Sequence, residues 1–205
     1  MFVIGLTGGI GTGKSEVCGI LSTLGAAVID ADLVGHEVYR AQTEGWHRIV
    51  EAFGEDVLGA TGAIDRKKLG AIVFGDAEAL ERLNAIAHPR IYAKIEERIA
   101  ELRGEGRTVA VVEAALLIEA NWTPLVDEVW VVVSAKQNVI DRLKNRHLDH
   151  ASIRARIGAQ MTQRERVKHG DVVIDNDGTL AELTQSIEQL WASRVARHKE
   201  NTTQR

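Results

Sequence analysis

Hydrophobic residues along the chain follow two alternating patterns. Short runs that are almost continuously apolar and rich in β-branched residues alternate with longer stretches in which apolar residues have helical spacing. Continuous apolar runs are typical of strands buried on both faces of a parallel sheet, and here they predict five strands, at residues 2–6, 26–30, 108–113, 128–133 and 171–175. The longer stretches predict helices over residues 14–24, 33–53, 65–102, 136–168 and 179–198. Within the third helix, Pro89 predicts a break at His88, because proline disfavours the helical conformation in the residue before it.

The order of these elements predicts the fold class. Strands that alternate with helices indicate a layered α/β fold with a mostly parallel, five-stranded sheet and right-handed crossovers. Two connections, residues 31–107 and 134–170, are longer than one crossover helix requires. We therefore expect a single domain over residues 1–205 with helical insertions at about 33–105 and 136–169. Both insertions are expected over the carboxyl ends of the strands, where open α/β sheets bind ligands.

Composition narrows the class of protein. A chain of 205 residues, 45% apolar and 26% charged, suits one soluble domain with a substantial core. The single cysteine, Cys18, excludes a disulfide within the chain, and we expect it to be a buried apolar side chain. The first apolar run has no basic residues before it and is soon interrupted by glycines, which predicts neither a signal peptide nor a membrane span. We therefore expect a cytoplasmic enzyme.

Basic residues concentrate in one segment. Residues 134–169 contain nine lysines and arginines and three acidic residues, although the whole chain has a net charge of -4. This pattern favours a local anionic partner and argues against a surface that binds nucleic acid throughout. A solvated helix face is an equally good interpretation of the charge alone.

The stretch GLTGGIGTGKSE, residues 5–16, contains the clearest motif. Gly8, Gly13, Lys14 and Ser15 match the phosphate-binding pattern G-x-x-x-x-G-K-[ST], with a predicted strand before it and a predicted helix after it. Glycines let backbone N–H groups curl around phosphate oxygens, and the helix adds the positive end of its dipole. Lys14 is expected to reach the β- and γ-phosphates, and the Ser15 hydroxyl to bind Mg²⁺. The candidate ATP-binding residues of this loop are Gly9, Gly11, Thr12, Gly13, Lys14, Ser15 and Glu16.

A pair of carboxylates follows the second predicted strand. In VIDADLVGH, Asp30 and Asp32 are two positions apart and point the same way while the chain stays extended. One could accept the proton of an attacking hydroxyl while the other holds a metal or an N–H network. Either could instead cap the helix that follows. The guanine-reading tetrad N-K-x-D is absent and the chain is short for a motor or transporter, so a small-molecule kinase is favoured.

Taken together, the motifs resemble the dephospho-coenzyme A kinase family over nearly the whole chain. The matching pieces are GLTGGIGTGKSEV, VIDAD…H, HPRI, ALLIE, VDEVWVV, RLKNR…ARIGAQM and GDVVIDNDGTL. The resemblance implies a P-loop kinase fold with a nucleotide-binding core, a helical acceptor-binding subdomain and a lid. It implies transfer of the γ-phosphoryl group of ATP, with Mg²⁺, to the ribose 3′-hydroxyl of dephospho-coenzyme A, which is the last step of coenzyme A biosynthesis.

The resemblance also implies roles for individual residues. Asp32 is implied as the general base on the acceptor hydroxyl. Arg142 and Arg146, four residues apart on one helix face, are candidates to cover the phosphates, with Arg142 the preferred γ-phosphate contact. Either arginine could instead be a solvated surface charge. Asn176 is expected beside the adenine of ATP, with an NDG turn as the plain alternative.

The acceptor is implied to bind His88, Arg90, Leu116 and Glu119. For His88 a purely structural role is an equal alternative. Ala115 stands where the family commonly has proline, which leaves the placement of the following residues less constrained.

Two other functions remain open on the sequence. One is a nucleoside monophosphate kinase or another small-molecule P-loop kinase, and the other is a P-loop module that uses ATP to switch a partner. We expect small-molecule substrates and neither nucleic acid nor a membrane as partners. The sequence leaves the oligomeric state, the order of substrate binding, the extent of lid closure and the position of the pantetheine arm open.

Overall fold

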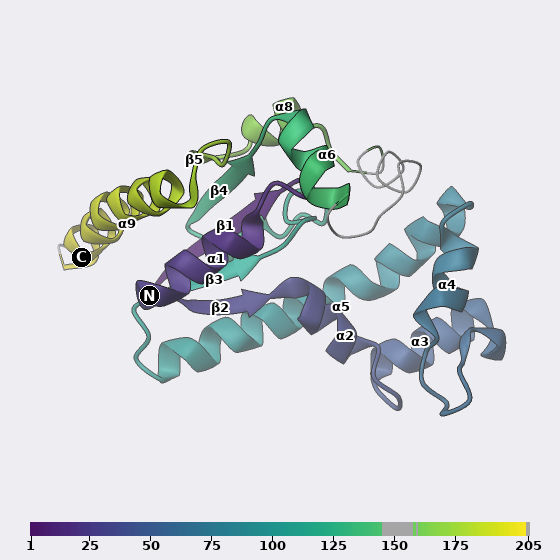
Figure 1. Ribbon diagram of the computed structural model, residues 1–205. Helices are drawn as coiled ribbons and strands as arrows, with labels where there is room; N and C mark the ends of the chain where they lie inside the picture. Colours follow the sequence, from purple (N-terminus) through teal and green to yellow (C-terminus); the bar gives the residue numbers. More distant parts are fainter. Residues whose placement is uncertain (145–157, 159, 204–205) are drawn as a thin grey trace. The chain divides into compact units, whose positions relative to one another are not determined.

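The computed structural model describes residues 1–144, 158 and 160–203, and the chain divides into two compact units. The first unit consists of residues 1–29 and 99–205, and the second of residues 30–98. Figure 1 shows the elements of both. No helix in the described ranges has the length and apolarity that a membrane crossing requires.

The first unit is built on a five-stranded sheet. Its strands are β1 (Phe2–Gly8), β2 (Ala27–Asp30), β3 (Val109–Glu113), β4 (Glu128–Val133) and β5 (Val172–Asp175). They lie in the order β2-β3-β1-β4-β5, with β1 parallel to β3 and β4, and β4 parallel to β5. Every residue of the central β1 is buried. The predicted strands and the mostly parallel α/β sheet are confirmed.

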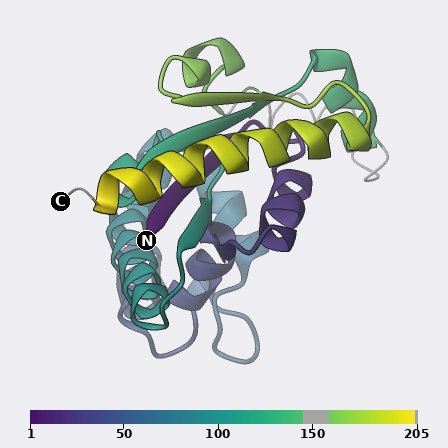
Figure 2. The same ribbon diagram turned by 90° about the vertical axis from the view of Figure 1, so that its left-hand side faces the viewer.

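Among the described residues, the helices that lie wholly in this unit are α1 (Lys14–Thr23), α6 (Lys136–Lys144), α8 (Gln163–Val167) and α9 (Leu180–Thr203). A short 3₁₀ turn, η2 (Thr123–Leu125), precedes β4. Apolar residues of α1 and α9 pack with the strands into one core, and Figure 2 shows the long α9 crossing in front of the strands. Cys18 is 6% exposed in this core, as predicted. In a smaller cluster, Val139 and Leu143 of α6 pack against Ile10 of the glycine loop.

The second unit is helical. It contains α2 (Ala31–Val38), α3 (Glu44–Phe53), η1 (Glu55–Val57), α4 (Arg66–Val73) and most of α5 (Ala77–Gly104), whose last turns belong to the first unit. Ile49, Val57 and Leu69 form its fully buried centre.

Two helices predicted as continuous are each divided. The segment 33–53 contains α2 and α3, because Gln42 adopts a φ of 70° and the Thr43 hydroxyl caps α3 by accepting from the Trp46 N–H at 3.1 Å. The segment 65–102 contains α4 and α5, because the Asp76 carboxylate accepts from the N–H groups of Glu78 and Ala79 and starts a new helix. Short polar side chains compete with helical hydrogen bonds and favour caps.

The prediction of a helix over 136–168 is confirmed near its two ends and is wrong at residues 160–162, which are not helical. Helix α6 covers residues 136–144, and α8 begins after Thr162, whose hydroxyl accepts from the Glu165 N–H at 3.2 Å. Residues 145–157 and 159 lie outside the described ones.

The predicted break at His88 is wrong, because α5 continues through Pro89. Proline removes one helical hydrogen bond and disturbs the turn before it. In that turn, Arg90 Nη1 donates to the carbonyl oxygen of Ile86 at 2.8 Å. Ala87, Ile91 and Ile95 are buried at four-residue spacing across the proline, and this packing holds one helix face in place.

Candidate functional site

The glycine motif forms the loop between β1 and α1. Gly11 and Gly13 have φ values of 78° and 96°, a region that favours glycine, and Gly13 is the N-cap of α1. A Cβ on Gly8 would lie 2.7 Å from the carbonyl oxygen of Val132, and one on Gly13 would lie 2.0 Å from Nδ2 of Asn176. Backbone conformation and close neighbours therefore both require glycine, as the motif predicts.

Side chains of the loop also fold onto its own backbone. The buried Thr12 donates through its hydroxyl to the carbonyl oxygen of Gly9 at 2.9 Å. Lys14 donates through Nζ to the carbonyl oxygen of Gly8 at 3.1 Å. The ammonium group thus lies against the loop, next to the start of α1, where a helix dipole also favours anions.

Arg142 and Asn176 bind the carbonyl side of this loop. Arg142 Nη1 donates to the Thr12 carbonyl oxygen at 3.3 Å and to the Ser134 hydroxyl at 3.2 Å, and its Nη2 donates to the Asn176 carbonyl oxygen at 2.7 Å. Nδ2 of the buried Asn176 donates to the same Thr12 oxygen at 2.8 Å. Two segments far away in the sequence therefore bind the Thr12 carbonyl oxygen of the loop.

A cavity of about 490 Å³ opens beside these residues. Its lining combines the loop, the first turn of α1, Arg142 and the segment after β5: Gly11, Gly13, Ser15, Glu16, Arg142, Asn176, Gly178, Leu180 and Leu183. Six of the predicted ATP-binding residues meet there. Gly9 and Thr12 line a different cavity, and Arg146 lies outside the described residues.

Asp177 connects the segment after β5 to the start of α6. Its Oδ1 accepts from the Ser134 hydroxyl and the Ala135 N–H, both at 2.7 Å, and from Asn138 Nδ2 at 2.9 Å. These hydrogen bonds, the backbone one first, hold the pKa of Asp177 below its usual value. The carboxylate stays ionised and fixes the two segments that flank the cavity.

In the second unit, the two predicted carboxylates have different surroundings. Asp30 is the N-cap of α2, and its Oδ1 accepts from the N–H groups of Asp32 and Leu33 at 2.8 and 3.1 Å. Asp32 lies exposed in the first turn of that helix. The sequence allowed either aspartate to cap the helix that follows, and the structure shows that Asp30 is the cap.

The other predicted acceptor residues are distributed over both units. In the second unit, Arg90 forms an ion pair with Glu44 at a groove of about 370 Å³, and burial lowers the pKa of His88. In the first unit, Leu116 is exposed and Glu119 forms an ion pair with Arg166.

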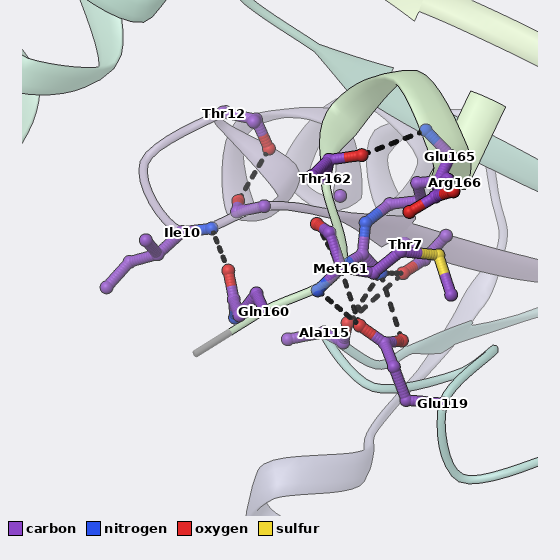
Figure 3. Close-up of polar contacts among 12 residues, drawn as sticks. Thr7, Ile10, Thr12, Ala115, Glu119, Gln160, Met161, Thr162, Glu165 and Arg166 are labelled. Atoms are coloured by element: carbon purple, nitrogen blue, oxygen red, sulfur yellow. Dashed lines mark hydrogen bonds and ion pairs between the residues drawn. The ribbon is translucent and has the colours of Figure 1, made fainter. Parts of the chain in front are cut away.

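Arg166 is the residue that sequence reasoning missed. It is 1% exposed, although the sequence shows it only as one charge of a basic segment. Its Nη1 donates to the Thr7 hydroxyl at 3.1 Å and to the Ala115 carbonyl oxygen at 2.9 Å, and its Nη2 donates to Glu119 Oε1 at 2.8 Å (Figure 3). The one local signal is the Thr162-x-x-Glu165 spacing that starts α8.

The sheet order, the loop between β1 and α1 and the adjoining cavity define a P-loop kinase. A solved shikimate kinase from Bacteroides thetaiotaomicron has the same fold, with a TM-score of 0.55 at 11% identity over 93% of this chain and 98% of that chain. A model of the dephospho-CoA kinase family matches residues 2–182. The dephospho-CoA kinase of Geobacter sulfurreducens is 50% identical over 95% of this chain and 99% of that protein. A solved dephospho-CoA kinase from Campylobacter jejuni gives a TM-score of 0.72 at 29% identity, covering 96% and 98% of the two chains. The chain belongs to the dephospho-CoA kinase family.

Proposed function

We propose that this protein transfers the γ-phosphoryl group of ATP to the ribose 3′-hydroxyl of dephospho-coenzyme A, which produces coenzyme A and ADP. The observation that carries this proposal is the family match over nearly the whole chain, joined to a P-loop with the required geometry. The second unit, residues 30–98, is proposed to bind the acceptor, and the segment 136–169 to form the lid.

On the nucleotide side, the cavity beside the loop is proposed to hold ATP. Backbone N–H groups of the loop and of the start of α1 would donate to the phosphate oxygens, and the Lys14 ammonium would neutralise part of their charge, which is how such loops act. Mg²⁺ fits the Ser15 hydroxyl, because that residue lines the cavity and Mg²⁺ in kinases is bound largely by substrate phosphates with few protein ligands. When bound, the metal neutralises charge on the β- and γ-phosphates.

Arg142 is proposed as a nucleotide-binding residue. Its bonds to the Thr12 and Asn176 carbonyl oxygens support a role in holding the loop and in flanking the nucleotide. Direct contact with the γ-phosphate requires the guanidinium to leave these carbonyls, so that contact stays a prediction. Arg146 lies outside the described residues, and its contact with the phosphates also stays a prediction.

On the acceptor side, Asp32 is proposed to accept the proton of the 3′-hydroxyl as phosphoryl transfer proceeds. Asp30 caps α2 and thereby fixes the backbone at Asp32, while the Asp32 carboxylate stays exposed for a substrate. Arg90 and Leu116 are proposed to contact the acceptor. His88 would do so as a neutral group at pH 7, because burial lowers its pKa. Glu119 is bound to Arg166, so its contribution would be to orient the turn that carries Leu116.

The proposal is tested by incubating the protein with ATP, Mg²⁺ and dephospho-coenzyme A and measuring 3′-phosphorylated product. We expect Asp32→Asn to lower the rate by about 10²- to 10⁴-fold, which is typical of removing a general base. Asp30→Asn is the matched control: asparagine also caps helices, so we expect a much smaller loss.

The outcomes separate the proposal from its alternative. Phosphorylation of a nucleoside monophosphate with no product from dephospho-coenzyme A would favour the alternative kinase. That reaction uses a phosphate oxygen as acceptor and needs no base, so Asp32→Asn would then have little effect.

A further inference from the structure

The P-loop has a polar contact with a residue that does not line the proposed nucleotide cavity. The N–H group of Ile10 donates to Oε1 of Gln160 at 2.8 Å, across 150 positions of sequence. Figure 3 shows this side chain reaching the loop from the chain segment that leads into α8. An N–H group at the tip of the loop is thus bound by the protein itself.

Two cavities adjoin the loop, and Gln160 lines one of them. Gln160 lines a cavity of about 310 Å³ together with Gly9, Ile10 and Thr12. Gly11, Gly13 and Ser15 line the 490 Å³ cavity instead, and the two linings share no residue. Gln160 therefore binds the loop from outside the cavity proposed for ATP.

The segment that carries Gln160 is itself anchored at each of the next three residues. The Met161 N–H donates to Glu119 Oε1 at 3.3 Å, and the Thr162 hydroxyl caps α8. Oε1 of Gln163 accepts from the Ser134 N–H at 3.2 Å. Hydrogen bonds thus join the residues after Gln160 to Glu119 and to Ser134.

The buried Arg166–Glu119 ion pair is the centre of this anchorage. Glu119 binds both the Arg166 guanidinium and the Met161 N–H, and Arg166 also donates to the Met161 carbonyl oxygen at 3.4 Å. Arg166 further binds Thr7, the residue before Gly8 at the start of the loop. Burying an arginine is unfavourable unless its donors are paired. Nη1 and Nη2 of Arg166 are paired, whereas Nε has no hydrogen-bond partner among the described residues, and the paired donors join the loop's entry to the segment that bears Gln160.

We propose that Gln160 is a positioning residue for phosphoryl transfer, which holds the P-loop in its phosphate-binding conformation from a segment fixed by the Arg166–Glu119 pair. The proposal rests on the proposed function for its reaction. The physical basis is a conformational equilibrium of the P-loop. When a smaller fraction of the protein has the loop in its phosphate-binding conformation, the apparent affinity for nucleotide is lower. The net contribution of one hydrogen bond corresponds to about fivefold in such an equilibrium.

The test is nucleotide affinity in Gln160→Met, which keeps the side-chain length and removes the acceptor. Binding of ATP and of ADP, each with Mg²⁺ and without any acceptor substrate, is measured by calorimetry on the full chain. We expect both dissociation constants to rise, by at most about fivefold, and amide hydrogen exchange of peptides covering the loop to become faster. The melting temperature should fall by no more than about 2–4 °C. Gln137→Ala, which removes a surface glutamine of α6 that binds Asp141, is the control and should leave nucleotide affinity unchanged.

Two results overturn the proposal. Unchanged affinity means that the contact does not position the loop. Tighter binding means that Gln160 competes with phosphate for the Ile10 N–H and inhibits instead.

If Gln160→Met folds poorly, Gln160→Ala gives the same comparison. Since no acceptor is present, a protein that binds ATP but leaves dephospho-coenzyme A unmodified would overturn the proposed function and leave this test intact.

The link to Arg166 is tested by a double-mutant cycle, because residues that act through one another are not additive. Arg166→Lys should weaken ATP binding in the native background and add little in the Gln160→Met background. Where Arg166→Lys does not fold, Glu119→Gln replaces it. Fully additive effects would overturn the link.

Discussion

Gly13→Ala is the sharpest perturbation of the P-loop. A residue with a side chain at φ 96° is strained by about 1–2 kcal/mol. In addition, the new methyl group would lie 2.0 Å from Nδ2 of Asn176, a buried side chain held by its bond to Thr12. Forcing an extra methyl group into a packed site destabilises by about 1–3 kcal/mol.

Gly25→Ala is the matched control, because Gly25 has a φ of 102° and a Cβ there meets no atom within 4 Å. The backbone strain and the effect on the entropy of the unfolded chain are then similar in both variants. The difference between their free energies of unfolding therefore reports the contact with Asn176. We expect Gly13→Ala to be less stable than Gly25→Ala by about 1–3 kcal/mol, with a melting temperature lower by about 2–4 °C for each kcal/mol.

Thermal unfolding followed by circular dichroism measures this difference. In the Asn176→Ala background, Gly13→Ala should lower the melting temperature much less than it does in the native chain, because the amide that would meet the methyl group is absent. Equal melting temperatures for Gly13→Ala and Gly25→Ala would refute the reasoning, because backbone strain alone would then explain the glycine.

Three further outcomes are expected. Arg142→Ala should weaken ADP binding by about tenfold in calorimetry, because the Thr12 and Asn176 carbonyl oxygens then lose their hydrogen bonds to the guanidinium. Hydrogen bonds to charged groups contribute about 1.5–3 kcal/mol. Unchanged affinity would contradict this role. Burial lowers the pKa of His88 in the folded protein, so the unfolded state binds its proton more readily and stability should fall as the pH drops through about 6.5. Urea unfolding at pH 7.5 and 5.5 should show a smaller loss in His88→Asn than in the native chain, and an equal loss would argue against this cause. Asp30→Ala should destabilise by about 1 kcal/mol through loss of the α2 cap, whereas Asp30→Asn should be nearly neutral in the same measurement.

Most of the sheet could be predicted because its signal is local. Each strand is a short apolar run, and the order of strands and helices restricts the topology to a few arrangements. Helix boundaries were less predictable, since Thr43 and Asp76 divide predicted helices by capping bonds that apolar spacing does not show. The continuity of α5 through Pro89 accompanies the burial of Ala87, Ile91 and Ile95 on one face of the helix. Local propensity alone favoured a break, and tertiary contacts decided otherwise.

At the site, the sequence identified groups whose chemistry follows from their spacing. The glycines, Lys14 and Ser15 act through backbone conformation within a few residues, so their arrangement can be derived from the motif. Arg166 could not be found this way, because its partners Thr7 and Glu119 lie 159 and 47 positions away. A buried arginine and a solvated one look the same in the sequence.

The α/β architecture and the phosphate-binding loop follow from the amino-acid sequence, because their signals lie in residues close together. The family follows from motifs along nearly the whole chain. The tertiary structure decided which polar groups serve as supports. It assigned the α2 cap to Asp30, brought Arg142 and Asn176 to the loop's carbonyls, and placed Gln160 on the Ile10 N–H. These are contacts between distant segments, and only the folded backbone determines which donor meets which acceptor.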